Sequence, residues 1–207
     1  MRLALAFILA LPGLAQAGGV AQLALAQELF ALGKTGGDPL VMLTAAKLAG
    51  AVDVTTVARK PETSGEVAAD QPDTAQAPAD AAAMLAEARA SVAPDETLAA
   101  LLAEAETGNA LVRAGTVSAS LQALAAGQTD TWHLPFDGGI AAELAVLGDG
   151  DGNLDVTLTD AEGRALCQET GPADRSLCGF LPVETGFFIL TVTNPGPGMN
   201  SYLLLTN

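Results

Sequence analysis

The sequence predicts an α+β protein of two modules, in which small all-α helical hairpins are followed by an all-β sandwich. Three observations predict this fold class. The first half is rich in Ala, Leu and Gln and carries helix-capping residues, whereas the apolar period changes to two from about Thr129. Gly and Pro clusters interrupt the second half at short intervals, as in all-β domains. The length of 207 residues leaves room for one or two small domains.

The first 17 residues have the parts of a secretory signal peptide. Arg2 gives a positive start, an apolar run follows, and Pro12-Gly13 ends that run. Ala15 and Ala17 are the small residues that cleavage after Ala17 requires. The apolar run is much shorter than the roughly 20 residues that cross a bilayer. We therefore expect a periplasmic or secreted mature protein that has no integral membrane association after signal cleavage.

Residues 18–110 are predicted to form an Ala-rich helical module of two hairpins. Asp38 and Asp80 provide helix caps, and Pro39 fits the first turn of the helix that it begins. A small helical packing unit is favoured over a repeat-type peptide groove, because neither hairpin carries a full tetratricopeptide pattern. The predicted helices run from Val20 to Leu32, from Pro39 to about Ala49, from Asp80 to about Val92, and from Pro94 to near Gly108.

A flexible linker is predicted inside this module, over residues 59–79. The segment holds Pro61, Pro72 and Pro78, and it has no Leu, Ile, Met or aromatic residue. Such a composition offers little apolar area to offset the ordering cost of about 1–2 kcal/mol per residue.

Residues 112–207 are predicted to form a β-sandwich of seven or eight short strands. In the segments 131–136 and 154–159, apolar residues occupy every second position, so one face of each strand enters the core. Further strands are predicted at Ile140–Leu147, Arg164–Gln168, Leu177–Leu181, Gly186–Thr193 and Met199–Leu205.

The charge of the chain bears on its partners. With 24 acidic and 9 basic residues, the formal net charge is −15. Because nucleic-acid affinity comes largely from Lys and Arg at phosphates, binding to DNA or RNA is not expected. The same charge favours solubility and repels anionic lipid.

Four segments of the second half share a recognisable pattern of glycines and strands: Ala126–Asp130, Asp151–Gly163, Glu184–Val192 and Tyr202–Leu205. Over residues 112–207 this pattern resembles the bacterial pre-peptidase C-terminal domain. That family is a small β-sandwich with a Gly-ended strand, an Asp-Leu-Asp-Leu-like strand with an Asp-x-x-Gly turn, and a Gly-Tyr-Tyr-x-x-Val-like strand. Here Phe187-Phe188 stand where the family usually has tyrosines.

The resemblance implies an accessory module, since such domains usually sit beside secreted proteases and assist substrate binding, secretion or stability. No protease accompanies it in this chain. The helical half is similar to the front part of exported proteobacterial proteins that end in this kind of sandwich. That second likeness implies no function.

No catalytic residue is predicted. The one histidine, His133, lies on a predicted strand opposite the apolar face, and a triad would need it near Thr131, Ser176 or Ser201. The chain lacks a Gly-x-Ser-x-Gly elbow, paired zinc ligands at finger spacing and a phosphate-binding loop. No cofactor is required by these motifs.

An acidic loop gives the one metal hypothesis. Asp149, Asp151, Asn153 and Asp155 place oxygen-bearing side chains at alternate positions, as calcium loops do. Leu154 stands where an EF-hand needs glycine, so the loop is not an EF-hand. The alternatives are a weak calcium site and a polar turn before a strand, of which the polar turn is favoured.

Cys167 and Cys178 are predicted to form a disulfide. An exported chain meets an oxidising compartment, and these two cysteines lie in neighbouring predicted strands.

Together these features predict an exported, non-catalytic binding or accessory module of the cell envelope, whose partner is an unknown protein or glycan. The alternatives are a secreted hydrolase with an unrecognised active site and a structural envelope component. Activity on generic peptidase, esterase and glycosidase substrates would identify the hydrolase.

Overall fold

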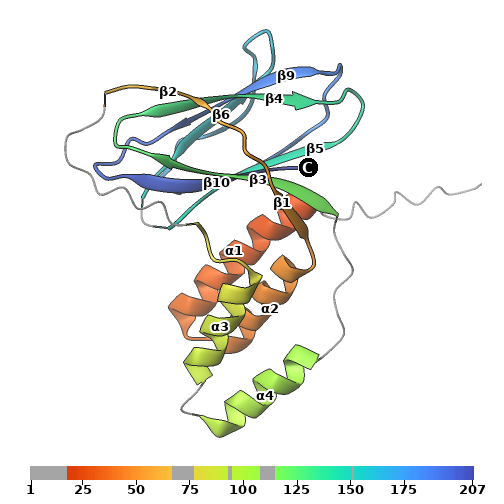
Figure 1. The fold of residues 1–207 in the computed structure, drawn as a ribbon, viewed down its shortest axis with the longest axis vertical. Helices are drawn as coiled ribbons and strands as arrows, with labels where there is room; N and C mark the ends of the chain where they lie inside the picture. Colours follow the sequence, from red (N-terminus) through yellow and green to blue (C-terminus); the bar gives the residue numbers. More distant parts are fainter. Residues whose placement is uncertain (1–17, 67–76, 93–94, 108–114, 151) are drawn as a thin grey trace, which may run out of the picture.

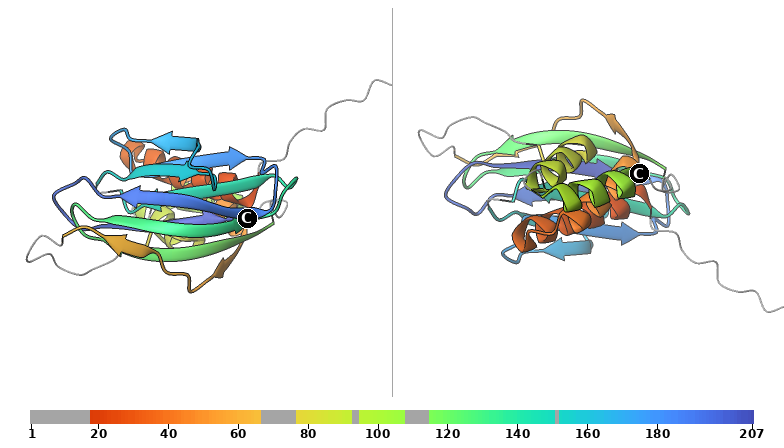
Figure 2. Two further views of the ribbon diagram at one scale, coloured as in Figure 1. Left: turned by 90° about the horizontal axis from the view of Figure 1, so that it is seen from above. Right: turned by 90° about the horizontal axis from the view of Figure 1, so that it is seen from below.

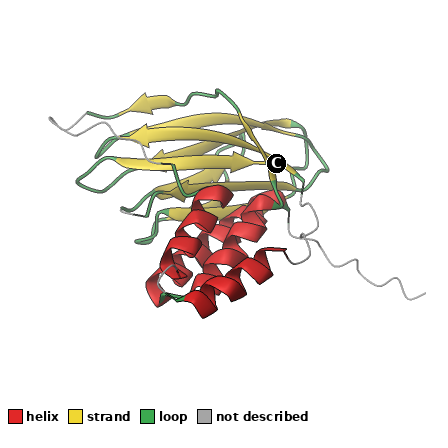
Figure 3. Cartoon of the chain, turned by 60° about the horizontal axis from the view of Figure 1, so that its bottom comes forward, coloured by secondary structure: helices red, strands yellow, loops and turns green. Residues whose placement is uncertain are grey.

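The computed structural model describes residues 18–66, 77–92, 95–107, 115–150 and 152–207. Within these ranges the chain forms four helices and ten strands, and the helices gather on one side of the strands (Figures 1 and 3). The predicted α+β class with a β-sandwich is confirmed. The predicted signal peptide, residues 1–17, lies outside the described residues.

The four predicted helices are present, but the first continues four residues beyond its expected end at Leu32, to Gly36. The Asp38 carboxylate accepts hydrogen bonds from two backbone amides of its helix, and Asp80 and Asp95 cap the third and fourth helices in the same way. None of the described helices is long and apolar enough to cross a membrane. The helices are α1 (Gly19–Gly36), α2 (Pro39–Gly50), α3 (Ala81–Val92) and α4 (Glu96–Thr107).

Small side chains let the helices approach closely. α1 packs on α2, and α2 packs on α3. The completely buried Ala26 and Ala88 lie in the same apolar cluster as Phe30, Met42 and Met84. Seven of the 19 buried residues of this cluster are alanines, and the other twelve are Val, Leu, Met or Phe.

Ten strands form two five-stranded sheets that face each other. The helix-side sheet has the order β1-β3-β10-β5-β8, and the outer sheet has the order β2-β4-β9-β6-β7. The pairing is antiparallel except between β1 and β3. The strands are β1 (Asp53–Thr56), β2 (Glu62–Ser64), β3 (Thr116–Leu124), β4 (Thr129–Phe136), β5 (Ala142–Gly148), β6 (Asp155–Thr159), β7 (Ala165–Glu169), β8 (Arg175–Phe180), β9 (Gly186–Thr193) and β10 (Asn200–Thr206).

The helix-side sheet is covered on both faces. Along β5, Leu144 and Val146 belong to the core between the sheets, whereas Ala145 and Leu147 belong to the core shared with the helices. Seen from below, the helices lie across this sheet (Figure 2). Because both faces of β5 are buried, the strand reads as a nearly continuous apolar run rather than an alternating one.

A chain of buried polar groups links the two sheets. Trp132 Nε1 of the outer sheet donates to Tyr202 Oη of the helix-side sheet at 2.8 Å. The Tyr202 hydroxyl donates to Asp130 Oδ2 at 2.6 Å, and Thr63 Oγ1 donates to Asp130 Oδ1 at 2.5 Å. Trp132, Tyr202 and Asp130 are each 2% exposed or less. These hydrogen bonds connect the two sheets to each other across the core.

The prediction of a flexible linker over residues 59–79 is wrong for its first part. Residues 62–64 form β2 at the edge of the outer sheet, paired with β4. Just before them, Arg59 Nε donates to Ser120 Oγ and Arg59 Nη1 donates to Thr206 Oγ1, both at 3.2 Å. Burial lowers the pKa of the Arg59 guanidinium. Residues 67–76 of the predicted linker lie outside the described residues.

The region predicted as a helical module therefore also supplies one edge strand to each sheet. β1 follows α2 directly and pairs with β3, and β2 follows after a short crossing segment. Both strands are exposed along their whole length, so their side chains show no apolar alternation. Main-chain hydrogen bonds hold them in place, and such bonds leave little trace in the sequence.

Candidate functional site

The predicted acidic loop connects β5 to β6. Asp149 follows β5 and donates its backbone amide to Ser201 O at 3.1 Å, and Asp155 begins β6. Asn153 Nδ2 donates to Asp155 Oδ1 at 3.3 Å. Leu154 between them is completely buried, as the strand pattern predicts. Among the four predicted ligands, the structure shows a contact only between Asn153 and Asp155, and Asp151 lies outside the described residues.

Two buried amide oxygens near this loop have no hydrogen-bond partner among the described residues. They are Asn153 Oδ1 and Asn200 Oδ1. Asn200 is 2% exposed, and its Nδ2 donates to Asn153 O at 3.4 Å. Calcium is bound by carboxylate and amide oxygens of this kind. Yet no group of three His, Cys, Asp or Glu side chains in the described ranges has metal-binding geometry.

The calcium hypothesis makes a direct prediction about stability. Millimolar calcium should raise the melting temperature, because binding to the native state alone adds about 1.4 kcal/mol at tenfold excess over Kd. Magnesium should do less, since its small octahedral shell releases water reluctantly. Asp151→Asn should remove most of the calcium increment and spare the fold. Equal melting temperatures in calcium and in chelator would leave the polar turn as the explanation of this loop.

The lone histidine does not meet the serines proposed as triad partners. His133 is exposed on β4 of the outer sheet. Ser176 lies on β8 and the buried Ser201 on β10, both in the helix-side sheet. Thr131 lies on the same outer face of β4 as His133. A triad would also need a carboxylate that orients the histidine. The fold therefore does not assemble a Ser-His pair from these residues.

The predicted disulfide is present. Cys167 on β7 is bonded to Cys178 on β8, and their Cα atoms are 6.0 Å apart. β7 ends the outer sheet and β8 ends the helix-side sheet. The bridge therefore joins the edges of two different sheets, whereas the sequence predicted only that the strands are neighbours. Because both sulfur atoms are used in the disulfide, they are not available as the two thiolate ligands of a zinc site.

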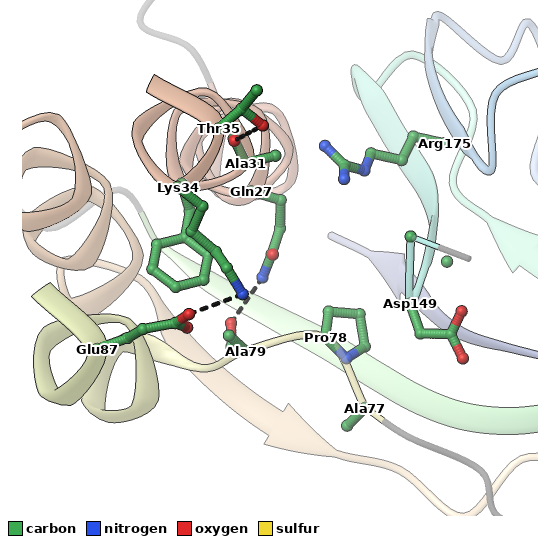
Figure 4. Close-up of a pocket in the computed structure, with 13 residues that line it drawn as sticks. Gln27, Ala31, Lys34, Thr35, Ala77, Pro78, Ala79, Glu87, Asp149 and Arg175 are labelled. Atoms are coloured by element: carbon green, nitrogen blue, oxygen red, sulfur yellow. Dashed lines mark hydrogen bonds and ion pairs between the residues drawn. The ribbon is translucent and has the colours of Figure 1, made fainter. Parts of the chain in front are cut away.

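A polar cleft of about 310 Å³ lies where α1 meets the sandwich (Figure 4). On its helical side, Lys34 Nζ is 2.7 Å from Glu87 Oε1 and 5.5 Å from the centroid of the Phe30 ring. Gln27 Nε2 donates to Ala79 O at 2.7 Å. These polar groups are bound to one another, so the helical wall of the cleft offers few unengaged donors.

The sandwich side of the cleft comes from residues 148–150 and Arg175. Arg175 Nε is 3.5 Å from Asp174 Oδ1, and Asp174 Oδ2 accepts a hydrogen bond from the Gly150 amide at 2.5 Å. The guanidinium of Arg175 points toward α1 (Figure 4). Asp149, a residue of the acidic loop, lines the same cleft. With both charge signs present, the cleft does not select for one sign of ligand.

A second hollow, of about 430 Å³, lies at the end of the sandwich where the chain terminus is marked in Figure 1. Its walls include Pro135, Ile140 and Asn207. Large apolar side chains are exposed beside it. We define this loop-end patch by Ile140 (61% exposed), Leu181 (64%), Val183 (93%) and Phe187 (61%).

The parts of the loop-end patch are connected. Pro135 lines the hollow with Ile140, and it is the register partner of Phe187 across β4 and β9. The Gly139 amide donates to Pro182 O at 2.8 Å, which joins the loop of Ile140 to the loop between Leu181 and Val183. These relations place the two loops and the β4–β9 strand pair next to one another at this end of the sandwich.

The sequence reasoning missed the loop-end patch. Its members lie in or beside turns, where single apolar residues are common, and no period marks them. Ile140 was expected inside a strand, but it precedes β5 and points outward. The one available signal was Val183, which follows Pro182. An apolar residue in a turn is not buried in the core, so it points to an exposed apolar surface.

No family model and no curated protein matches the sequence. The chain is similar to the solved pre-peptidase C-terminal domain of a collagenase from Bacillus anthracis, with 15% identity, a TM-score of 0.36, and coverage of 42% of this chain and 86% of that one.

Two further solved structures are similar to the chain. One is PliG of Aeromonas hydrophila, a periplasmic inhibitor of g-type lysozyme, with 14% identity, a TM-score of 0.34, and coverage of 44% of this chain and 84% of that one. The other is a carbohydrate-binding module, CBM36, in complex with calcium and xylotriose, with 13% identity, a TM-score of 0.25, and coverage of 41% and 76%.

Proposed function

We propose that the protein is an exported, non-catalytic binding module of the cell envelope, and that it contacts a protein partner through the loop-end patch. The observation that carries this proposal is the exposure of four large apolar side chains at one end of the sandwich. Burying one such side chain contributes about 1.5–3 kcal/mol. Contiguous apolar surface of this kind marks interaction sites on soluble proteins.

The surroundings of the patch favour a partner with basic residues at its rim. Asp137 lines the hollow, and the exposed Glu184 lies in the second loop. The whole chain carries a net charge of −15. Opposite charge at an interface rim speeds association and excludes partners of like charge. The partner is therefore expected to combine an apolar centre with Lys or Arg around it.

The placement of aromatic residues favours a protein over a glycan. Sugar rings stack on exposed aromatic faces, but the single Trp132 and the single Tyr202 are buried in the sandwich. Among the described aromatic residues, Phe187 alone is more than half exposed. One phenylalanine beside aliphatic neighbours fits an apolar protein surface better than a sugar-binding platform.

Capture of proteins from an envelope extract, compared between the wild-type protein and two double variants, tests the proposal. We expect Val183→Ser with Phe187→Ser to lose a captured protein that the wild-type protein retains, because the double variant removes apolar area without touching the core. Leu25→Ser with Leu32→Ser on α1 is the matched control, since these leucines are 47% and 60% exposed. Added salt should slow binding to the wild-type protein.

Each outcome decides between the candidates. Equal losses in both double variants, or retention by the patch variant, would reject the patch as the binding surface. Capture that survives protease treatment of the extract would assign a glycan ligand instead. Turnover of a generic peptidase, esterase or glycosidase substrate by the purified protein would show that the protein is a hydrolase and not a non-catalytic binding module.

A further inference from the structure

The beginning of α1 is held against the sandwich by one carboxylate. Glu143, near the start of β5, accepts a hydrogen bond from the Gly18 backbone nitrogen at its Oε1, at 3.1 Å. Its Oε2 accepts one from the Ala21 amide at 3.2 Å. These contacts join residues more than 120 positions apart. Glu143 therefore acts as a helix cap supplied by the sheet.

α1 has no cap of its own. Gly18 occupies the N-cap position without a side chain, and the first turn holds no acidic residue. The unpaired amides and the dipole of a helix start favour a negative charge there. Glu143 supplies that charge from outside the helix, so the attachment of α1 to β5 is electrostatic as well as apolar.

Glycine is the residue that permits this approach. A Cβ atom built on Gly18 would overlap the carboxyl group of Glu143. The backbone of Gly18 has φ −66° and ψ 168°, which any residue adopts, so the constraint is space and not backbone strain. Gly18 is also the first residue after the predicted signal cleavage point, Ala17.

We propose that cleavage after Ala17 creates a charged latch, in which the new α-ammonium group of Gly18 pairs with the Glu143 carboxylate. A signal peptidase adds water across the Ala17–Gly18 peptide bond. Ala17 leaves with a carboxylate, and Gly18 keeps the nitrogen, which binds a proton near neutral pH because an α-amino group has a pKa of about 8. The contact thus changes from a neutral amide to an ion pair.

The latch would tie folding of the helical layer to removal of the signal peptide. A charge-assisted hydrogen bond is about twice as strong as a neutral one. In the precursor, the same nitrogen holds one hydrogen and no charge, so α1 is attached to β5 less firmly. The inference rests on the export proposed above, but it makes no use of the loop-end patch.

Three purified forms test the latch: one that begins at Gly18, the same form with an acetylated N-terminus, and one that begins at Gln16. We expect the first to melt about 2–4 °C above the other two, a shift of the size that one ionic contact gives in a protein of this length. The sign follows because the charge-assisted bond to Glu143 outweighs the weaker repulsion between the ammonium group and the positive end of the α1 dipole. Glu143→Gln should abolish the difference among the three forms. Equal melting temperatures in the wild-type background would overturn the proposal.

A pH series provides a second readout. A paired ammonium has a raised pKa in the folded state, so its contribution is complete below the unfolded pKa of about 8 and is lost as the pH rises through the folded value. The charged group bonded to the nitrogen is Glu143 of β5, and the side chain of Asn207, which accepts a hydrogen bond from the Glu143 backbone amide, is neutral. The acetylated form shares both groups. The difference between the two forms should therefore vanish by about pH 10, and a constant difference would reject an ionic contact.

Gly18→Ala tests the need for space without removing the ammonium. Its Cβ should shift the flexible Glu143 carboxyl group and so reduce the advantage of the free N-terminus. Gly36→Ala, at the other end of α1, is the matched control because a Cβ there meets nothing within 4 Å. An undiminished advantage in Gly18→Ala would contradict the latch. Sequencing the N-terminus of protein recovered from cells tests the cleavage itself, independently of any partner.

Discussion

Tyr202→Phe should lower the free energy of unfolding by about 2–5 kcal/mol. The substitution removes one hydroxyl, which leaves Asp130 Oδ2 and Trp132 Nε1 without their partners in the core. A buried polar group that loses its partner costs about 1–3 kcal/mol, and a charged one costs more. Urea denaturation followed by Trp132 fluorescence measures the loss, since the chain has a single tryptophan.

A double-mutant cycle separates this network from simple packing. The losses of unfolding free energy in the single variants Asp130→Asn and Tyr202→Phe should add to more than the loss in the double variant. The difference, which is the coupling energy, should be about 0.5–3 kcal/mol. Additive effects would mean that the hydroxyl and the carboxylate act independently. A Tyr202→Phe protein within 0.5 kcal/mol of wild type would show that the two sheets do not depend on this bond.

Tyr202 should also limit the stability of the folded protein at alkaline pH. Burial raises the pKa of the Tyr202 hydroxyl, and the nearby Asp130 carboxylate, by its charge and its hydrogen bond, raises it further. A raised folded pKa means that the stabilisation is complete below the unfolded value of about 10 and is lost at higher pH. Because Tyr202 is the only tyrosine, tyrosinate absorbance should appear together with unfolding and not before it.

The strands that line the core between the sheets were predictable from the sequence. Residues 186–193 form β9 with the expected ends, and the alternation in 131–136 gives the buried face of β4. Alternation reports burial on one face of a strand, so it identifies strands of this kind. The helix starts were predictable for a different reason, since Asp38, Asp80 and Asp95 act locally.

Three strands were not predicted, and each departs from alternation for a physical reason. β1 and β2 are edge strands whose side chains are exposed, so their attachment rests on main-chain hydrogen bonds. β3 lacks a clear alternation because both of its faces are mixed. Val117 and Ala119 belong to the core shared with the helices, whereas Ser120 and Gln122 pair with Leu204 and Tyr202 on the face toward the other sheet. The hydroxyl of Ser120 is bonded to Arg59 and to Val57 O, so a polar residue stands where the sequence pattern needs an apolar one.

The candidate binding surface was less predictable than the fold. The loop-end patch arises because register places Pro135 opposite Phe187 and because the Gly139 amide reaches Pro182. Both are long-range relations that local patterns do not carry. The contact of Gly18 with Glu143 has the same character. By contrast, the cysteine pair was predictable, since composition alone leaves one pairing in an oxidising compartment.

Reducing the Cys167–Cys178 bond should lower the free energy of unfolding by about 2–3 kcal/mol, the value for closing a loop of this length in the unfolded chain. The bond joins β7 and β8, which end different sheets, so the reduced protein should also open at this edge. Hydrogen exchange should then increase at β7 and β8 before it increases at β4 and β9 in the interior of the sandwich.

Cys167→Ala with Cys178→Ala separates the bond from the packing of its sulfur atoms. Cys178 is 2% exposed, so its replacement also removes buried volume and should destabilise further than reduction does. Reduction of the double variant should change nothing, which makes it the control for effects of the reductant. Thiol titration of the unreduced, denatured wild-type protein should find no free sulfhydryl. Two free sulfhydryls would show that the bond does not form. Equal urea midpoints for the oxidised and reduced proteins would show that the bond does not help to hold the two sheets together.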